Sequence, residues 1–163
     1  MLRRVTVAAE STGQARLGRV LFICIRNSAR SQMAEAFLNR ACAGEITVES
    51  AGFEPGTINP LAIATMQEVG IDISENSTQS TFDVYKSGIL FSHVVTVCDE
   101  SSAEACPIFP GIVKRLHWNI ADPSALPGTW EERLEAVRSI RQDISDKVDA
   151  LCRELCHPSA DAS

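Results

Sequence analysis

The stretch VLFICIRNSARSQMAEAF, residues 20–37, decides how the chain folds. Its apolar run is typical of a buried parallel strand and ends on Cys24. A short run of small and polar residues follows, and apolar residues at helical spacing begin after Arg30. The order of strand, loop and helix is the first half of a β-α-β unit, so the stretch predicts an α/β fold.

The rest of the chain alternates in the same way. Further strands are expected at 46–49, 93–98 and 114–118, and helices at 31–43, at about 60–69 and from 129 onward. We therefore predict a three-layer α/β sandwich, with a central parallel sheet of about four strands and helices on both faces. Residues 1–18 carry no pattern and are expected to form a flexible extension, whereas 19–157 form a single domain.

Composition excludes several classes of function. A net charge of −6 argues against sequence-independent binding of nucleic acid, which needs a basic face. No apolar run reaches the roughly 18 residues of a membrane span. The N-terminal residues lack the apolar segment of a signal peptide. We expect a cytoplasmic protein without nucleic-acid or membrane partners.

The chain has six cysteines, which is many for a reducing compartment. No C-x-x-C pair is present and the three histidines stand singly, which argues against structural zinc. Catalytic or redox-active thiols are the better explanation. Cys42 is expected to be a small core residue late in the first helix. Cys152 and Cys156, four residues apart on the last helix, share one face as packed or exposed thiols.

The loop from Cys24 to Arg30 has the length and the ends of an oxyanion cradle. Its backbone N–H groups can surround a tetrahedral anion, and the helix N-terminus adds partial positive charge. Arg30 offers a fork of donors for two oxygens, and Ser31 can donate to the Cys24 sulfur. These donors stabilise a thiolate, which makes Cys24 a strong nucleophile. The pattern C-x5-R alone also fits a buried structural cysteine and an unrelated arginine, but its place between strand and helix favours the cradle.

Seven residues are expected to bind the oxyanion: Ile25, Arg26, Asn27, Ser28, Ala29, Arg30 and Ser31. Asn27 tolerates the left-handed backbone that a tight loop often requires.

Two further stretches bring chemistry to the carboxyl edge of the sheet. Asp122 follows the strand at 114–118, within reach of the cradle, and could protonate a leaving oxygen. An ordinary Asp-Pro turn is the plain alternative. Cys98 ends a strand, and Cys106 follows eight residues later across a polar loop that could rearrange. One thiol could then reach Cys24 and afterwards the other, although packing alone could also explain the pair.

A resemblance to a known family rests on several motifs in order. The segments VLFICIRNSARSQMAEAF, VESAGFEPGTINPLAI, VGIDIS, VVTVCDESSAEACPIFPG and HWNIADP resemble the arsenate reductases built on the low-molecular-weight protein tyrosine phosphatase fold, from about residue 19 to 151. The resemblance implies that Cys24 attacks arsenate held by the loop and Arg30. It also implies that Asp122 is the general acid that helps to expel water.

The resemblance further implies a relay of disulfides. Cys98 would attack the Cys24 sulfur and release arsenite, leaving a Cys24–Cys98 disulfide. Cys106 would then take over Cys98, and thioredoxin would reduce the Cys98–Cys106 disulfide. Relatives differ in the reductant, since some use glutathione and glutaredoxin or mycothiol, and the sequence leaves this choice open.

No tightly bound cofactor is expected. Relatives with the relay bind a potassium ion near the loop, and Asn27, Glu35 and Ser50 match the positions that contribute there. The chain departs from the family at two loop positions. Arg26 stands where the loop usually has glycine, and Ala29 stands where many relatives carry a second cysteine.

Two other functions compete with arsenate reduction. A tyrosine phosphatase shares the cradle and the acid, but it has no need of Cys98 and Cys106 and usually places aromatic residues beside the Asp-Pro pair. Weak phosphatase activity remains compatible with the same cradle. A non-catalytic redox or anion sensor normally loses the nucleophile, the arginine or the acid, and this chain keeps all three. Arsenate reduction is therefore the favoured function.

Overall fold

The computed structural model describes residues 18–98 and 106–156 of the 163-residue chain. The described strands form one parallel sheet in the order β3-β2-β4-β5. They are β2 (Arg19–Cys24), β3 (Thr47–Gly52), β4 (His93–Thr96) and β5 (Lys114–His117). The helices are α2 (Arg30–Ala41), α3 (Pro60–Gln67), α4 (Thr81–Lys86) and α6 (Trp130–Cys156), with a 3-10 turn η2 (Pro123–Ala125).

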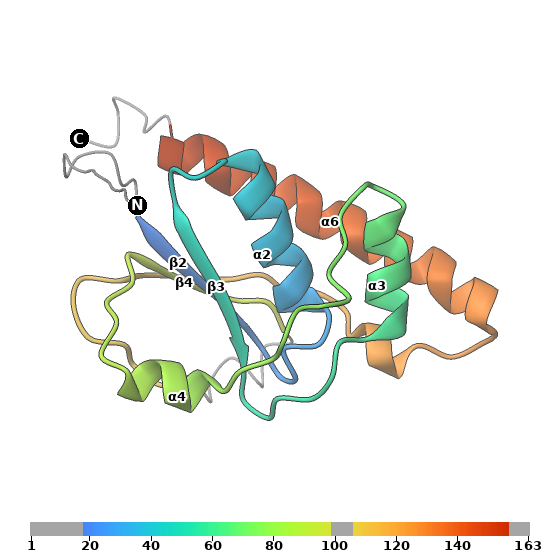
Figure 1. Cartoon of the computed structure of the whole chain (residues 1–163), viewed down its shortest axis with the longest axis horizontal. Coiled ribbons are helices and arrows are strands. Elements are labelled where there is room, and N and C mark those ends of the chain that lie inside the picture. Colours follow the sequence, from blue (N-terminus) through green and yellow to red (C-terminus); the bar gives the residue numbers. More distant parts are fainter. Residues whose placement is uncertain (1–17, 99–105, 157–163) are drawn as a thin grey trace, which may run out of the picture.

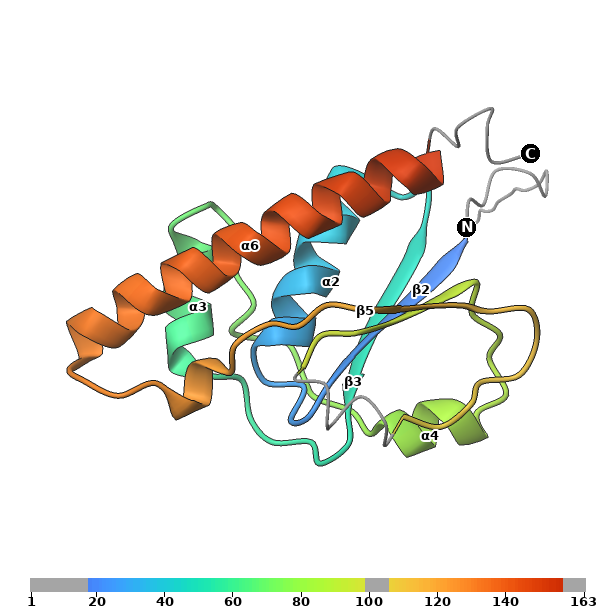
Figure 2. The same ribbon diagram turned by 180° about the vertical axis from the view of Figure 1, so that it is seen from behind.

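Helices cover both faces of the sheet, as Figures 1 and 2 show from opposite sides. Because side chains alternate along a strand, Val20 and Phe22 of β2 pack on the face covered by α2, α3 and α6. Leu21 and Ile23 pack on the other face, beneath α4. The predicted three-layer sandwich with a parallel four-stranded sheet is confirmed. The predicted N-terminal extension lies outside the described residues except for Gly18.

Most element bounds differ from the predictions by one or two residues, and two differences are larger. β3 runs on to Gly52 instead of ending at Glu49, because the small residues Ser50 and Ala51 continue the pairing with β2. Helix α4 was not predicted. It has six residues and buries only Thr81 and Val84, so its apolar pattern is too short to identify.

The C-terminal helix α6 follows the predicted pattern over its 27 residues. Its buried stripe consists of Leu134, Val137, Ile140, Ile144, Val148, Leu151 and Leu155. This stripe packs against α2 and α3 in the larger core. Within the described part of the chain, no helix combines the length and the apolar character needed to cross a bilayer.

Two arginines of α6 bind the end of α3. Glu68, the C-cap of α3, accepts hydrogen bonds from Arg138 Nη2 and Arg141 Nη1, both at 2.8 Å. Arg141 also donates to the carbonyl oxygen of Thr65 at 2.7 Å. Hydrogen bonds from Arg138, and then from Arg141, lower the pKa of Glu68 to about 2. The ion pairs therefore tie α3 to α6 wherever Glu68 is ionised.

We predict that Glu68→Gln lowers stability in a pH-dependent way. The folded-state pKa of about 2 lies below the ordinary 4.5, so the contribution of Glu68 is complete above pH 4.5 and is lost as the pH falls toward 2. Urea denaturation of both proteins across this range should show a difference that shrinks with falling pH. Glu135→Gln removes a partner of Arg138 within α6 only, and it should have a smaller effect. A difference that is independent of pH would contradict the prediction.

Candidate active site

The loop that joins β2 to α2 turns its carbonyl oxygens outward. Four of these oxygens, at residues 24–26 and 28, accept hydrogen bonds from the segment that follows β3. The carbonyl oxygen of residue 27 accepts a hydrogen bond from a side chain of α2. The pairs are Cys24 with Phe53, Ile25 with Glu54, Arg26 with Gly56 and Ser28 with Asn59, each through the backbone N–H, and Asn27 with Gln32 Nε2. In a trans peptide the N–H of the next residue points the opposite way. The N–H groups of residues 25–29 therefore face the interior of the loop.

Helix α2 points its N-terminus into the same loop. Its N-cap is Ala29, whose side chain caps no N–H, and its first turn carries no acidic residue. The first N–H groups of a helix have no partner within the helix, so they are available to an anion. The helix dipole adds partial positive charge at this point. Loop and helix together therefore have the shape that the predicted oxyanion cradle requires, and binding of an oxyanion by residues 25–31 stays a prediction.

Asn27 adopts the left-handed conformation with φ 55°, the one non-glycine residue with positive φ among those described. This confirms the expectation for Asn27 and turns its N–H toward the Cys24 sulfur at 3.2 Å. Its side-chain amide donates to Ser31 Oγ at 2.8 Å and to Ser50 Oγ at 2.9 Å. Its Oδ1 accepts from the N–H of Gln79 at 2.9 Å. Both the backbone and the side chain of Asn27 are therefore hydrogen-bonded, and these bonds fix the shape of the loop.

Cys24 lies at the base of the cradle, at the end of β2. Its side chain is 2% exposed, and its sulfur lies 3.0 Å from Ser31 Oγ. The Ser31 hydroxyl and the Asn27 N–H both approach the sulfur. Donors of this kind stabilise a thiolate, so the surroundings suit a nucleophile.

Arg30 joins the cradle to the loop of the predicted acid. The buried guanidinium donates to the carbonyl oxygen of Ile120 at 3.1 Å, and its Nη2 lies 3.8 Å from Asp122 Oδ1. Asp122 caps the turn η2, where Oδ1 accepts from Ser124 N at 2.9 Å and from Ser124 Oγ at 2.8 Å. The Asp-Pro segment therefore forms a capped turn and also brings its carboxylate to Arg30.

A cavity of about 680 Å³ opens at the mouth of the cradle. Asp122 lines it together with two cations, Arg26 and Arg133. Arg133 Nε is buried and has no hydrogen-bond partner among the described residues. Arg26 therefore places a cation at the entrance of the cradle. The cavity suits an anionic substrate.

Cys98 lies close to the cradle in the sheet. The N–H of Val97 donates to the carbonyl oxygen of Ile23 at 2.7 Å, which continues the pairing of β4 with β2 up to the residue before Cys98. Cys98 is fully buried at this carboxyl edge. The structure therefore brings Cys98 to the same edge of the sheet as Cys24.

Cys106 lies in the smaller core beneath α4, with Phe91 and Phe109 among its neighbours. Burial raises the pKa of the Cys106 thiol, and the charge of Arg115 opposes this effect. The residues between Cys98 and Cys106, 99–105, lie outside the described residues. The predicted rearrangement of this loop therefore remains a prediction.

A second hollow beside the loop is lined by acidic residues. It has a volume of about 410 Å³ and includes Glu35, Glu49 and Glu75 together with Ser50. Ser50 Oγ donates to Glu35 Oε1 at 2.5 Å, and burial raises the pKa of Glu35. Oxygen donors with several carboxylates suit a hard cation. Glu35 and Ser50 therefore fit the predicted potassium site, whereas the side chain of Asn27 connects that site to the cradle.

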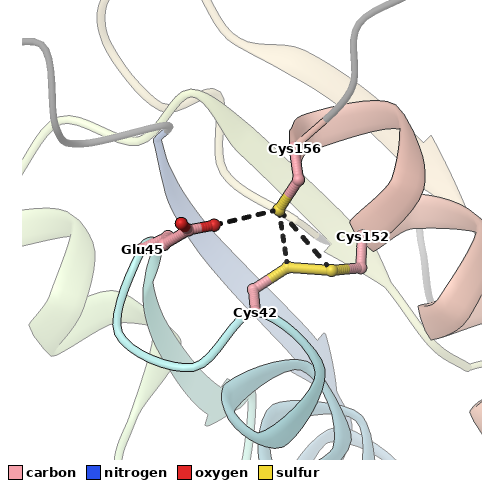
Figure 3. The surroundings of a disulfide bond; sticks show 4 residues. All are labelled: Cys42, Glu45, Cys152 and Cys156. Carbon is pink, nitrogen blue, oxygen red and sulfur yellow. Dashed lines mark hydrogen bonds between the residues drawn. A yellow bond between two sulfur atoms is a disulfide. The ribbon is translucent and has the colours of Figure 1, made fainter.

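One prediction about the cysteines is wrong. Cys42 is buried as expected, but it forms a disulfide with Cys152 of α6 and is not a plain core residue. Cys156 lies against this disulfide (Figure 3). The partners are 110 residues apart in sequence, so no local spacing predicts this bond. The related pattern in the sequence is that Cys152 and Cys156, four residues apart, share a helix face.

Comparison with known proteins agrees with this geometry. The sequence profile of the family described as low molecular weight phosphotyrosine protein phosphatase matches residues 19–159. The chain belongs to this family. Within it, an arsenate reductase of Bacillus subtilis (strain 168) is 40% identical over 131 residues, covering 79% of this chain and 91% of the relative.

Solved structures give the same picture. Two are described as an arsenate reductase in oxidized state and an arsenate reductase in the phosphate binding state, with TM-scores of 0.71 and 0.66. Each is 31% identical and covers 84% of this chain and 98% of its own. A thioredoxin-dependent arsenate reductase of Corynebacterium glutamicum is 26% identical with a TM-score of 0.58, covering 83% of this chain and 64% of its own.

We predict that Gly52→Ala damages the cradle. A methyl group at this position would lie 2.6 Å from Asn27 N and 2.8 Å from Ile25 O, so the backbone of the loop would have to move. Overpacking of this kind costs about 1–3 kcal/mol of unfolding free energy. Urea denaturation should show this loss, and phosphate binding measured by calorimetry should weaken. Gly56→Ala is the control, because its methyl group meets only the flexible side chain of Arg26. Unchanged stability and phosphate binding in Gly52→Ala would contradict the prediction.

Proposed function

We propose that this protein reduces arsenate to arsenite, with Cys24 as the nucleophile. The observation that carries the proposal is the loop around Cys24, whose carbonyl oxygens bind outward so that its N–H groups face inward, with Asn27 N 3.2 Å from the sulfur. An oxyanion bound there presents its central atom to the sulfur. Relatives that are about 40% identical and carry the name arsenate reductase support the choice of arsenate over a phosphate ester.

The first step forms a bond between sulfur and arsenic. The Cys24 thiolate attacks arsenic while the loop N–H groups and Arg30 hold the other oxygens. A hydroxyl group of the arsenate leaves as water after it takes a proton from Asp122. The position of Asp122 supports this role, since its carboxylate lines the cavity at the loop and its Oδ1 lies 3.8 Å from Arg30 Nη2.

The second step reduces arsenic. Cys98 attacks the Cys24 sulfur, so a sulfur–sulfur bond forms and the sulfur–arsenic bond breaks. The electron pair of that bond stays on arsenic, which passes from the pentavalent to the trivalent state and leaves as arsenite. Cys106 then attacks Cys98 and releases the Cys24 thiolate. Burial raises the pKa of Cys106, so this thiol has to leave its place in the core before it can act.

A protein dithiol such as thioredoxin is the proposed reductant of the Cys98–Cys106 disulfide. Apolar side chains next to Cys106 support docking of a protein, because Ile108 is 78% exposed and Ile112 is fully exposed. Leu90, 61% exposed, lies beside Gly111 in the same region. Glutathione with glutaredoxin is the alternative reductant. A cycle that depends on reduced thiols fits a reducing compartment, so we place the protein in the cytoplasm.

Potassium is the proposed ion of the acidic hollow. Glu35 and Ser50 would hold it, and its positive charge would stabilise the ionised Glu35 carboxylate. Asn27 bonds both to Ser50 Oγ and, through its N–H, to the Cys24 sulfur. An ion that fixes the positions of Glu35 and Ser50 would therefore also fix the loop around Cys24, through Asn27.

Consumption of NADPH on addition of arsenate tests the function. One reaction contains thioredoxin and thioredoxin reductase, and a parallel one contains glutathione, glutaredoxin and glutathione reductase. We expect turnover with the thioredoxin system. Turnover only with glutaredoxin would support arsenate reduction and identify glutathione with glutaredoxin as the reductant. Hydrolysis of an aryl phosphate without any NADPH consumption would show a phosphatase instead.

We predict that Cys24→Ser and Cys98→Ser fail at different steps. Cys24→Ser should abolish both arsenate reduction and hydrolysis of an aryl phosphate, because both reactions start with attack by this sulfur. Cys98→Ser should lose multiple turnovers with arsenate and keep the weak phosphatase activity, because only reduction needs the second thiol. Multiple turnovers with thioredoxin in Cys98→Ser would overturn the relay.

Glu35→Gln should remove the stimulation of arsenate turnover by potassium. Burial raises the pKa of Glu35, so the native protein should also lose this stimulation as the pH falls toward that raised pKa, because protonation removes the charge that attracts the ion. Initial rates in potassium and in choline chloride of equal ionic strength measure the effect. Glu75→Gln, at the edge of the same hollow, serves as the control. Equal stimulation of Glu35→Gln and the native protein would contradict the potassium site.

A further inference from the structure

A second sulfur site lies at the end of α2 that is remote from Cys24. Cys42 is the C-cap of α2, and the 12 residues of the helix place it roughly 18 Å along the axis from the cradle at 1.5 Å per residue. The last turns of α6 bring Cys152 and Cys156 to this point. The catalytic steps proposed for Cys24, Cys98 and Cys106 use none of these sulfurs.

The three sulfurs form one compact group (Figure 3). Cys42 and Cys152 are joined by a disulfide, with their Cα atoms 6.2 Å apart. Cys156 Sγ lies 3.2 Å from Cys42 Sγ and 3.7 Å from Cys152 Sγ. Within the described ranges 18–98 and 106–156, this is the one group of three metal-ligating residues whose ligand atoms all lie within 4.8 Å of one another.

The group is accessible on one side. A cavity of about 310 Å³ is lined by Cys152, Cys156 and Glu45 together with Asp149. Cys42, on the inner side, is 4% exposed and packs in the larger core. A small solute can therefore approach two of the sulfurs from solvent, while the third is held in place by packing.

We propose that Cys42, Cys152 and Cys156 bind trivalent arsenic when the disulfide is reduced. A dithiol supplies two electrons and two protons to the Cys42–Cys152 bond and is itself oxidised to a disulfide. One molecule of arsenous acid, As(OH)₃, then condenses with the three thiols. Three arsenic–sulfur bonds form, three water molecules leave, and no electrons are transferred in this second step.

The number and type of donors favour trivalent arsenic over zinc. Trivalent arsenic binds three soft sulfur ligands and keeps a lone pair on its fourth side. A structural zinc ion takes four ligands. Glu45 Oε1 lies 3.6 Å from Cys156 Sγ, but it does not join the group of atoms within 4.8 Å. Three adjacent sulfurs, two of which line a small cavity, therefore match arsenic better.

Burial, and then the Glu45 carboxylate, raise the pKa of Cys156. Condensation with neutral arsenous acid consumes thiols and releases water, so the site takes its ligand without burying a net charge. The choice of arsenic rests on the proposed function, because arsenite is the product of that reaction. The site would hold product away from the cradle, and oxidation of Cys42 and Cys152 would close it.

The test uses the full chain with Cys24→Ser, Cys98→Ser and Cys106→Ser, so that only the three sulfurs of the new site remain. After reduction with a phosphine and removal of oxygen, sodium arsenite is titrated in. The readouts are the ultraviolet absorption of arsenic–sulfur bonds, native mass spectrometry and the number of thiols that still react with a disulfide reagent. We expect one arsenic per chain and the loss of three reactive thiols. The oxidised form of the same protein is a matched control and should bind none.

Adding Cys156→Ser to this chain should weaken arsenite binding by more than about 100-fold, because loss of a second-shell partner alone costs a metal site 10–100-fold. Circular dichroism verifies that the variant is folded. In the otherwise native chain, Cys156→Ser should leave arsenate turnover unchanged, since Cys156 lies outside the catalytic loop.

Three results would overturn the proposal. They are undiminished arsenite binding in the Cys156→Ser variant, fewer than three thiols protected per arsenic, and uptake of one zinc ion per chain that arsenite does not displace. The test is independent of turnover. If the triple variant binds arsenite but the native chain does not reduce arsenate, the site is retained and the proposed function is refuted. If the native chain reduces arsenate but the triple variant binds no arsenite, the function is retained and the site is refuted.

Discussion

The structure depends on the direction of the peptide groups between Cys24 and Ala29. Their carbonyl oxygens are taken up by the segment 53–59 and by α2, so their N–H groups have to face inward. This single constraint creates the anion site, and it requires β3 to lie directly beside the loop. Gly52 allows that approach, because any larger residue would meet the loop backbone. The loop can therefore keep this shape only if β3 lies next to β2 in the sheet.

Asn27 connects the parts of this region. Its left-handed backbone turns one N–H toward the nucleophile, and its side chain bonds to Ser31, Ser50 and the backbone of Gln79. The acidic hollow at Glu35 is reached through Ser50. An ion in the proposed potassium site would therefore act on the cradle through the hydrogen bonds that join Glu35, Ser50 and Asn27, without contact with the substrate.

Helix α2 carries sulfur chemistry at both ends. Its N-terminus, with the uncapped N–H groups next to Arg30, favours an anion and a thiolate. Its C-terminus holds Cys42 against α6, where burial and then the Glu45 carboxylate raise the pKa of Cys156. The first end thus offers donors to an oxyanion, and the second offers the sulfurs that are proposed to condense with a neutral acid.

The sequence by itself determined the α/β class and the stripe of α6, because these follow from local periodicity. It also identified the loop from Cys24 to Arg30 as the candidate cradle, because the two residues are close along the chain. It also predicted the left-handed backbone of Asn27, which depends on a local steric preference. Only the tertiary structure decided which way the loop carbonyl oxygens point, since most of the N–H groups that bind them lie in the distant segment 53–59. It alone decided the pairing of Cys42 with Cys152, because 110 residues of chain separate them and only the packing of α6 on α2 brings them together.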